Sequence, residues 1–533
     1  MKKEYRLKTI TLSALLSVAL LTGCAPLGPD FAGVNSIKVP VTWQKQGKRN
    51  DAEIAQWWKI FNDPTLNRLV LKSYAQNLDL KAAGLRILQA RAALGISEGL
   101  QYPQVQTLSG SVAGVRQNNN SFSSAGLSFD IGWEMDIWGK YARGIESSEA
   151  TLFTSLASYN DIMISVIAEV ARHYINYRTN QERIAYAERN IVIQKRVTEI
   201  TEVQFNSGNV SELDMQQARA QYYATRSALP SLKLNMITAR NALAVLMGTD
   251  IMTVEKILHQ EKNDDSIGKY INTQKSFVQI KEGDRDNINV SFVPTAKFNP
   301  YYKIDAGLLR QRPDLKVAEY QAHSNAAKIG LKEAELYPSF TLFGNIGLSS
   351  NNALGSWTTG GNTLGVTLGP AFSWNIFQYD RIKNQIRLQD AIFEESLVNY
   401  NKKVLSAVSE VSDALNGYRL TKEQLDENKK AVNATVRAFN ISMTQYNDGL
   451  VSYERLLSSV DSLTRNQDRY AQIKGALATN VILLYKALGG GWQINKGKAY
   501  VSKEMAQKMQ KRTDWGAYLD ANMTRLPDGF GDD

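Results

Sequence analysis

The sequence predicts a mainly α-helical fold with membrane β-strands, in which a long coiled-coil α-barrel joins a transmembrane β-barrel. Three observations support this fold class. Only 12 of the 533 residues are proline, and two stretches of about 65 residues, 141–205 and 381–446, contain none. Because proline ends helices, such stretches favour long continuous helices. Shorter runs alternate apolar and polar residues, as strands do, and the whole arrangement occurs twice.

The N-terminus has the features of a signal peptide. Residues 1–23 begin with the charged MKKEYRLK and continue with an apolar run from Thr9 to Leu20, which is too short to span a bilayer. The run LTGC resembles the lipobox of bacterial lipoproteins, and Cys24 is the only cysteine. The resemblance implies acylation of Cys24 and, because Ala25 follows, anchoring to outer-membrane lipid. A chance cysteine behind an ordinary signal peptide is the alternative.

The positive charge of the chain is spread thinly. The net charge is +10, and removal of residues 1–23, with four basic residues and one acidic residue, leaves +7. No block of Arg and Lys with interleaved aromatic residues occurs. The sequence therefore predicts no nucleic-acid partner.

The chain repeats itself with an offset of about 240 residues. The matches are collinear and include polar, aromatic and glycine positions, so duplication is the simplest explanation. They pair Asp-Leu-Lys at 79–81 with 314–316, Tyr-Pro at 102–103 with 337–338, Gly208 with Gly449, and Gly248 with Gly489.

Both repeats have the same internal plan. A helix of about 25 residues ends at Tyr-Pro, two strands follow, and a helix roughly 100 Å long turns at a glycine into a returning helix of about 40 residues. The strands are expected at about 104–116 and 124–138, and again at about 339–349 and 363–377. The predicted divisions are a signal peptide (1–23), a lipidated linker (24–75), repeat 1 (76–248), a connecting segment (249–311), repeat 2 (312–491) and a tail (492–533).

The returning helices carry the apolar spacing of coiled coils, with alternating steps of three and four residues. The first such seam runs from Met215 to Leu246 and contains Pro230, which is expected to kink or break the helix. The second runs from Leu456 to Ala487 and includes more polar members. Such a seam is expected to face other helices in a shallow groove.

The predicted strands indicate a location in a membrane. Apolar residues from Leu127 to Met135 occupy alternate positions, with Ser128, Asp130 and Glu134 among the residues between them. This is the pattern of a membrane barrel, although a soluble sandwich with one buried face has it too. Four strands cannot close a barrel, and known membrane barrels begin at eight. Three copies with 12 strands would leave an open lumen, so a homotrimer is expected.

The plan and several strings resemble the outer membrane factor family, the TolC-like channels of tripartite efflux pumps. These strings are CAPLGPDF, WWKIFNDPTLNRLV, EMDIWGK, LRQRPDL and LLYKALGGGW. The resemblance implies a passive trimeric duct that accepts small molecules from an inner-membrane RND-type pump through a periplasmic adaptor, a membrane fusion protein. It also implies that residues 24–75, 249–311 and 492–533 contribute to an equatorial belt around the helical tube.

By the same resemblance, the glycine turns lie at the periplasmic tip, where adaptors dock. Gly208, Ser211, Gly449 and Ser452 are the docking candidates. Many relatives constrict the tip with a ring of aspartates, but the corresponding residue here is Ser458. Our hypothesis is that nearby residues replace that ring, and the alternative is that they are ordinary solvated helix residues. The gate candidates are Tyr446, Glu454, Arg455 and Asp461, with Asp214 in the first repeat.

No pattern typical of an enzyme is present. The three histidines, His173, His259 and His323, lack the spacing of zinc motifs, and GGNTLG lacks the GK[ST] of a phosphate loop. We therefore expect no catalytic residue, no metal and no cofactor. The sequence leaves two alternative functions: a type I protein secretion channel, and a periplasmic coiled-coil lipoprotein scaffold without a pore. The sequence does not specify the cargo, because the pump and the adaptor select it.

Overall fold

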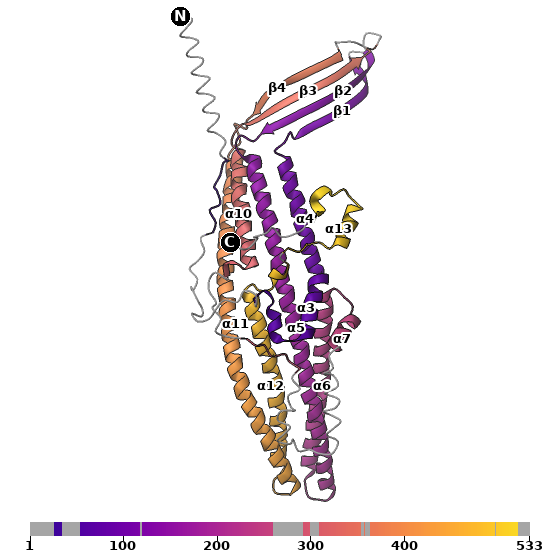
Figure 1. Ribbon diagram of the computed structural model, residues 1–533, viewed down its shortest axis with the longest axis vertical. Coiled ribbons are helices and arrows are strands. Elements are labelled where there is room, and N and C mark those ends of the chain that lie inside the picture. The colour runs from indigo at the N-terminus through magenta and orange to yellow at the C-terminus, as the bar shows by residue number, and fades with distance from the viewer. Residues whose placement is uncertain are drawn as a thin grey trace.

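The protein is an elongated helical body with a β-sheet at one end (Figure 1). The computed structural model describes residues 26–34, 54–117, 120–259, 292–298, 309–352, 357, 363–495 and 497–520. The expected signal peptide, the acylation site at Cys24, most of the connecting segment and the end of the tail lie outside the described residues.

Two helical hairpins form the body, one from each repeat. The long helices expected over 141–205 and 381–446 are present as α5 and α11, each 67 residues long. None of the described helices is both long enough and apolar enough to cross a bilayer. The α-helices are α3 (Pro64–Gln76), α4 (Leu78–Gly99), α5 (Lys140–Asn206), α6 (Glu212–Met247), α7 (Ile251–His259), α10 (Pro313–Ala334), α11 (Arg381–Asn447), α12 (Tyr453–Ala487) and α13 (Lys503–Gln510). The 3-10 helices are η1 (Trp57–Phe61), η4 (Trp492–Asn495) and η5 (Gly516–Leu519).

Pro230 does not break the returning helix of the first hairpin. Helix α6 is continuous from Glu212 to Met247, and Pro230 lies on its exposed face. On the opposite face, the expected seam packs against α5 over the whole length of the helix, with Met215 and Leu243 buried near its two ends. This packing on both sides of the proline offsets the hydrogen bond that the proline removes.

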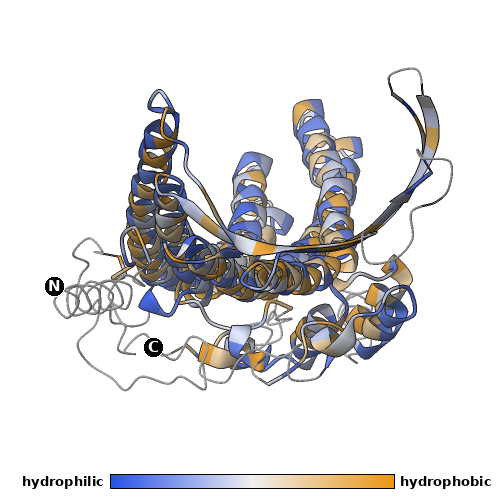
Figure 2. Cartoon of the chain, turned by 90° about the horizontal axis from the view of Figure 1, so that it is seen from above, coloured by the Kyte–Doolittle hydropathy of each residue, from blue (hydrophilic) through white to orange (hydrophobic). Residues whose placement is uncertain are grey.

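The two repeats join in one antiparallel sheet in the order β1-β2-β3-β4. The strands are β1 (Val105–Gln117), β2 (Asn120–Met135), β3 (Ser339–Asn351) and β4 (Leu364–Ser373). Strand β2 starts earlier than expected and ends at Met135. It ends there because the Asp136 side chain accepts hydrogen bonds from the backbone N–H groups of Tyr141 and Ala142, at 3.0 and 2.8 Å, and so caps the start of α5. Figure 2 shows the sheet as a curved band, with the helices standing along an arc.

The register of the sheet separates an apolar face from a polar face. Leu108, Phe129, Ile346 and Val366 follow one another across the four strands on the first face. The neighbouring row on the other face is Thr107, Asp130, Asn345 and Thr367. In a strand, successive side chains point to opposite sides, so the alternation in sequence becomes two chemically different surfaces.

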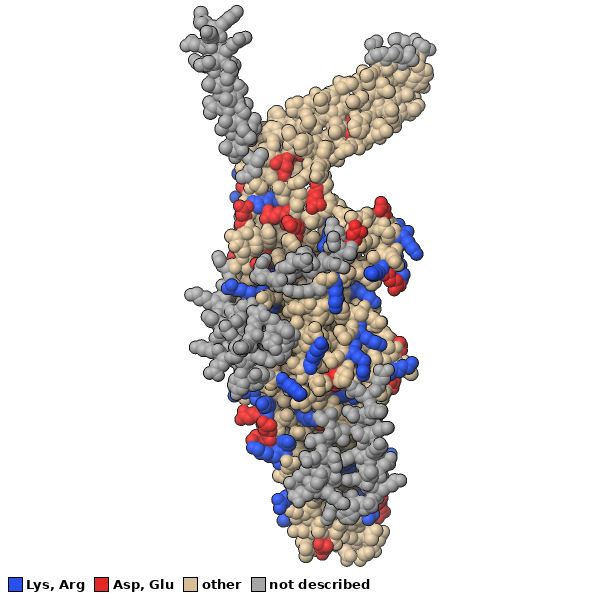
Figure 3. All heavy atoms as spheres, in the orientation of Figure 1, with Lys and Arg blue, Asp and Glu red and all other residues tan. Residues whose placement is uncertain are grey.

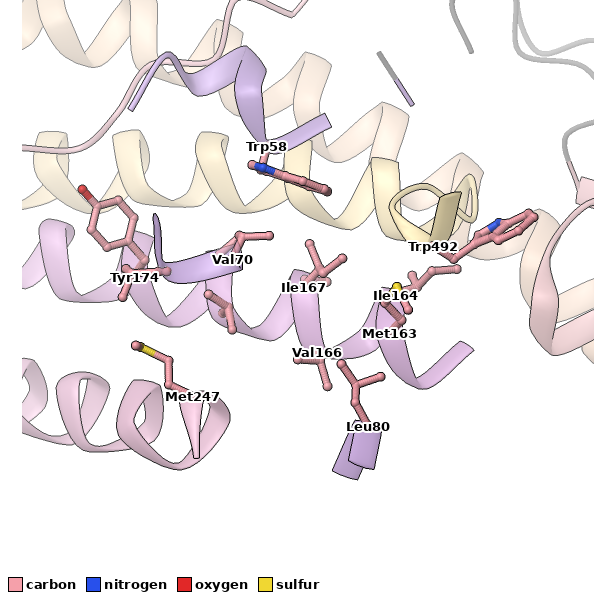
Figure 4. Packing of buried hydrophobic residues seen from close by; sticks show 14 of the residues in the cluster. Trp58, Val70, Leu80, Met163, Ile164, Val166, Ile167, Tyr174, Met247 and Trp492 are labelled. Atoms are coloured by element: carbon pink, nitrogen blue, oxygen red, sulfur yellow. The ribbon is translucent and has the colours of Figure 1, made fainter. Parts of the chain in front are cut away.

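The main core lies at the middle of the helical body. Trp58 and Val70, from the N-terminal segments, meet α5 residues such as Ile167 and Tyr174, while Met247 closes the core from α6 (Figure 4). All five side chains are almost fully buried. Burial of each such side chain contributes about 1.5–3 kcal/mol, so this core holds the short segments firmly against the long helix.

Candidate functional site

The tip of each hairpin is built by the same turn. Gly208 and Gly449 have φ angles of 74° and 70°, in the left-handed region that favours glycine. One residue after each glycine, a backbone N–H donates to a carbonyl five residues earlier, Asn209 to Gln204 at 2.9 Å and Leu450 to Gln445 at 2.8 Å. This hydrogen bond is typical of a helix C-terminus that closes on glycine. The turn geometry alone therefore accounts for both glycines.

The helices that follow the two turns are capped differently. Ser211 and Asp214 form a reciprocal capping box, in which the Asp214 carboxylate accepts hydrogen bonds from the Ser211 N–H at 3.0 Å and its hydroxyl at 2.7 Å. Ser452 occupies the equivalent position of α12 without a side-chain cap bond. Among the candidate residues in this region, Asp214 thus has a structural role, the capping of α6, that already accounts for an aspartate at this position.

Tyr446 is buried inside a single protomer. Only 2% of the residue is exposed, and its ring packs edge-on against Tyr453 with the centroids 6.0 Å apart. The hydroxyls of Tyr446 and Thr201 lie 3.3 Å apart and share a hydrogen bond between α11 and α5. Burial raises the pKa of both tyrosines. Both rings therefore remain neutral, and Tyr446 connects the second hairpin to the first at the tip.

A polar groove lies beside these tyrosines, between α11 and α12. Its volume is about 650 Å³, and Glu454, Arg455 and Ser458 line it together with Ser452. The structure thus brings four of the residues singled out from the sequence onto one surface. Asp461 makes an ion pair with Arg465 on its own helix, with 2.5 Å between the charged atoms. Its charge is therefore partly compensated within α12.

A row of polar contacts joins α5 to α12 above the tip, and the sequence patterns do not reveal it. The Glu182 carboxylate binds the Lys474 ammonium at 2.8 and 2.9 Å, with only 3% and 12% of the two side chains exposed. Arg183 makes a two-pronged contact with Asp468 at 2.7 and 3.1 Å. These pairs connect the first hairpin to the second and limit their relative movement.

The sheet end has the chemistry of a membrane-facing surface. Figure 3 shows the sheet nearly free of Lys, Arg, Asp and Glu, in contrast to the helical body. At the junction with the helices, the indole N–H groups of Trp133, Trp138 and Trp374 donate to backbone carbonyls at 2.8–3.0 Å. Indoles with one apolar side and one polar atom are typical of the interface between a bilayer and water.

The residues that follow Cys24 are fastened at the same junction. Arg143, 4% exposed, donates to the carbonyls of Leu27 and Gly28 at 2.9 and 3.1 Å and pairs with Asp30 at 2.7 Å. Gly28 itself lies so close to Gly330 of α10 that a Cβ atom would overlap its backbone. The segment 26–30 is therefore held at the sheet end of the helical body.

Within the described part of the chain, no group of three or more His, Cys, Asp or Glu side chains is placed to hold a metal ion. A sequence profile described as "Outer membrane efflux protein" matches residues 69–249 and 307–490. The chain belongs to this family. The two matched blocks correspond to the two repeats, so the duplication expected from the sequence is a property of the outer membrane efflux protein fold.

Relatives of this family cover almost the whole chain. The probable outer membrane lipoprotein SilC of Salmonella typhimurium is 25% identical over 497 residues, which are 92% of this chain and 99% of that protein. The pyoverdine export outer membrane protein OpmQ of Pseudomonas aeruginosa is 24% identical over 499 residues, 91% of this chain and 97% of that protein. The solved outer-membrane channel OprN is 26% identical with a TM-score of 0.73, and covers 88% of this chain and 99% of that one.

These findings confirm the fold class, the location and the general function expected from the sequence. The protein is an outer-membrane efflux channel of a tripartite system, from a family of trimeric channels, and it is not an enzyme. The two ends of the molecule, the sheet and the tip with its polar groove, are the candidate functional surfaces.

Proposed function

We propose that three copies of this chain form a passive duct that exports small molecules across the outer membrane. The sheet carries this proposal. Its order leaves β1 and β4 each with one edge that is unpaired within the protomer, and unpaired backbone groups inside a bilayer cost several kcal/mol each. Pairing of β4 with β1 of the next copy satisfies every edge and closes a ring of strands. The apolar face then meets lipid and the polar face lines the lumen.

The helical body supports the same assembly. Large apolar side chains remain exposed along α11, including Val398, Leu405 and Leu420, and along α6, including Leu234 and Val245. Such stripes on a soluble surface are typical of contacts with another protein. We assign them to contacts between neighbouring copies, which extend the barrel as a helical tube.

The tip is proposed to serve as gate and docking site. Glu454 and Arg455 project charge into the polar groove, and three-fold symmetry would repeat them around the opening. Tyr446, buried within its own protomer, would hold the hairpins in the closed arrangement, with Asp461 and Asp214 in supporting roles. Gly208, Ser211, Gly449 and Ser452 are the proposed contacts for the periplasmic adaptor, which connects the channel to an inner-membrane RND-type pump.

The anchor is proposed to be an acylated Cys24. Only Ala25 lies between it and Pro26, so their Cα atoms are at most about 7 Å apart in an extended chain. The contacts of Arg143 with residues 27–30 would therefore keep the acyl chains beside the sheet end of the molecule. Segments 24–75, 249–311 and 492–533 are assigned to the equatorial belt. In the described part, α3 and α7 pack together near the middle of α5 and the C-terminal end of α6, which supports this assignment.

The size and conductance of the purified protein test the duct. We expect a trimer by light scattering in detergent and stable conductance in a planar bilayer. A monomer without conductance would refute the proposal.

Two matched substitutions then test the gate. Glu454→Ala should raise the conductance of the closed channel. Asp461→Ala should have a smaller effect, because Asp461 is already paired with Arg465. Equal or absent effects would mean that these residues are ordinary solvated positions.

A further inference from the structure

Asp130 lies near the middle of β2 on the polar face of the sheet. The register places it beside Thr107 of β1 and Asn345 of β3, and Thr367 of β4 completes the row. One adjacent row on the same face contains only small residues: Ser109, Ser128, Gly347 and Gly365. The other adjacent row includes Val105 and Phe343, so the space beside the Asp130 carboxylate is bordered by small side chains on one side only.

Neutral donors fix this carboxylate. Asn345 donates from Nδ2 to Oδ1 at 2.6 Å, and Ser128 donates from its hydroxyl to Oδ2 at 3.2 Å. The Ser128 hydroxyl lies 2.8 Å from that of Ser109, so the network reaches β1. Hydrogen bonds from neutral groups hold the orientation of a carboxylate without cancelling its charge.

No cation compensates Asp130 within the described strands. The other charged residues of these strands are Arg116 and Glu134. Arg116 is separated from Leu108 and Val112 by an even number of positions along β1, so it lies on the same, apolar face of the sheet. Glu134 is engaged at the helical end by Lys140 at 3.0 Å and by the Tyr141 hydroxyl at 2.9 Å. The linkers 118–119 and 352–363 contain no charged residue in the sequence.

We propose that Asp130 makes the outer-membrane section of the duct selective for cations. The inference rests on the proposed trimer, in which the polar face lines the lumen and three copies of Asp130 face the same space. Their uncompensated charges attract cationic cargo and repel anions through water, over a Debye length of about 10 Å at 0.1 M salt. The cargo class favoured at this point is a small organic or metal cation.

Reversal potentials of the full-length channel in a KCl gradient across a planar bilayer test the proposal. Asp130→Asn preserves shape and can still accept the hydrogen bond from Asn345. We expect the cation-to-anion permeability ratio to fall about threefold or more near 0.1 M salt, and the difference to shrink near 1 M. Asp130→Lys should invert the preference.

Arg116→Gln is the matched control, because it also removes one charge from the sheet but on the opposite face. Its permeability ratio should equal that of the unmodified channel. An Asp130→Asn channel that conducts with an unchanged ratio would overturn this inference alone. A channel without conductance in its unmodified form would overturn the proposed duct as well, so the two failures are distinguishable.

Discussion

The buried ion pair between the hairpins offers the sharpest test of how the helical body is held. Glu182 and Lys474 are connected by two contacts of 2.8 and 2.9 Å, with 3% and 12% of their side chains exposed. Lys474→Met keeps the length of the side chain and removes the charge. It leaves the Glu182 carboxylate buried without a cation, which costs about 3–5 kcal/mol of the free energy of unfolding.

The assay is equilibrium unfolding in urea, in detergent, at fixed protein concentration. The matched control is Lys430→Met, which removes the partner of Glu427 in an exposed pair, with 74% and 67% of the two side chains accessible, and should leave the free energy of unfolding nearly unchanged. Adding Glu182→Gln to Lys474→Met should restore much of the loss, because the uncompensated charge disappears. Equal losses for the two lysine variants would refute the reasoning.

Three further predictions follow from local geometry. Gly475→Ala should lower the free energy of unfolding by about 1–3 kcal/mol, because the new Cβ would overlap Thr179 of α5. The loss should be smaller when Thr179 is also replaced by Ala. Equal losses in both backgrounds would contradict this prediction. Burial first, and then the nearby Asp314, raise the pKa of Asp161 above its ordinary value of 3.8. Its charged form is therefore disfavoured in the folded state, so Asp161→Asn should raise the melting temperature at pH 7, with the gain vanishing below about pH 3.8; a gain that persists there would contradict the assignment. Arg143→Met should speed proteolysis within residues 26–34, because it removes the contacts that hold this segment. The control Arg172→Met, at a half-exposed arginine, should not. Equal rates of cleavage in the two variants would contradict the role of Arg143.

Local patterns predict a large part of this fold. Long stretches without proline predict α5 and α11, and the positive φ of the turns follows from Gly208 and Gly449. Alternation predicts the strands, although not their ends, because the carboxylate of Asp136 decides where β2 stops. The spacing Ser-x-x-Asp at residues 211–214 is typical of a capping box, which is the role that Asp214 has in the structure.

The candidate site depends more on contacts between distant segments. Tyr446 is a gate candidate by position, but the structure turns its ring inward, where it meets Thr201 across 245 residues of sequence. The pairs Glu182 with Lys474 and Arg183 with Asp468 follow no common spacing that a sequence pattern could show. Likewise Pro230 remains inside a continuous helix because packing outweighs its local preference.

The sequence by itself therefore determined the repeated unit, the long helices, the glycine turns and the two chemically different faces of the strands. All of these arise from periodicity or from the backbone preferences of single residues. Only the tertiary structure decided which charges are compensated, which are buried and which stand on the polar face of the sheet. Asp130 illustrates the reason: its alternation was visible in the sequence, but its neutral partners come from β2 itself and from β3, and only the pairing of the two repeats brings Asn345 to it.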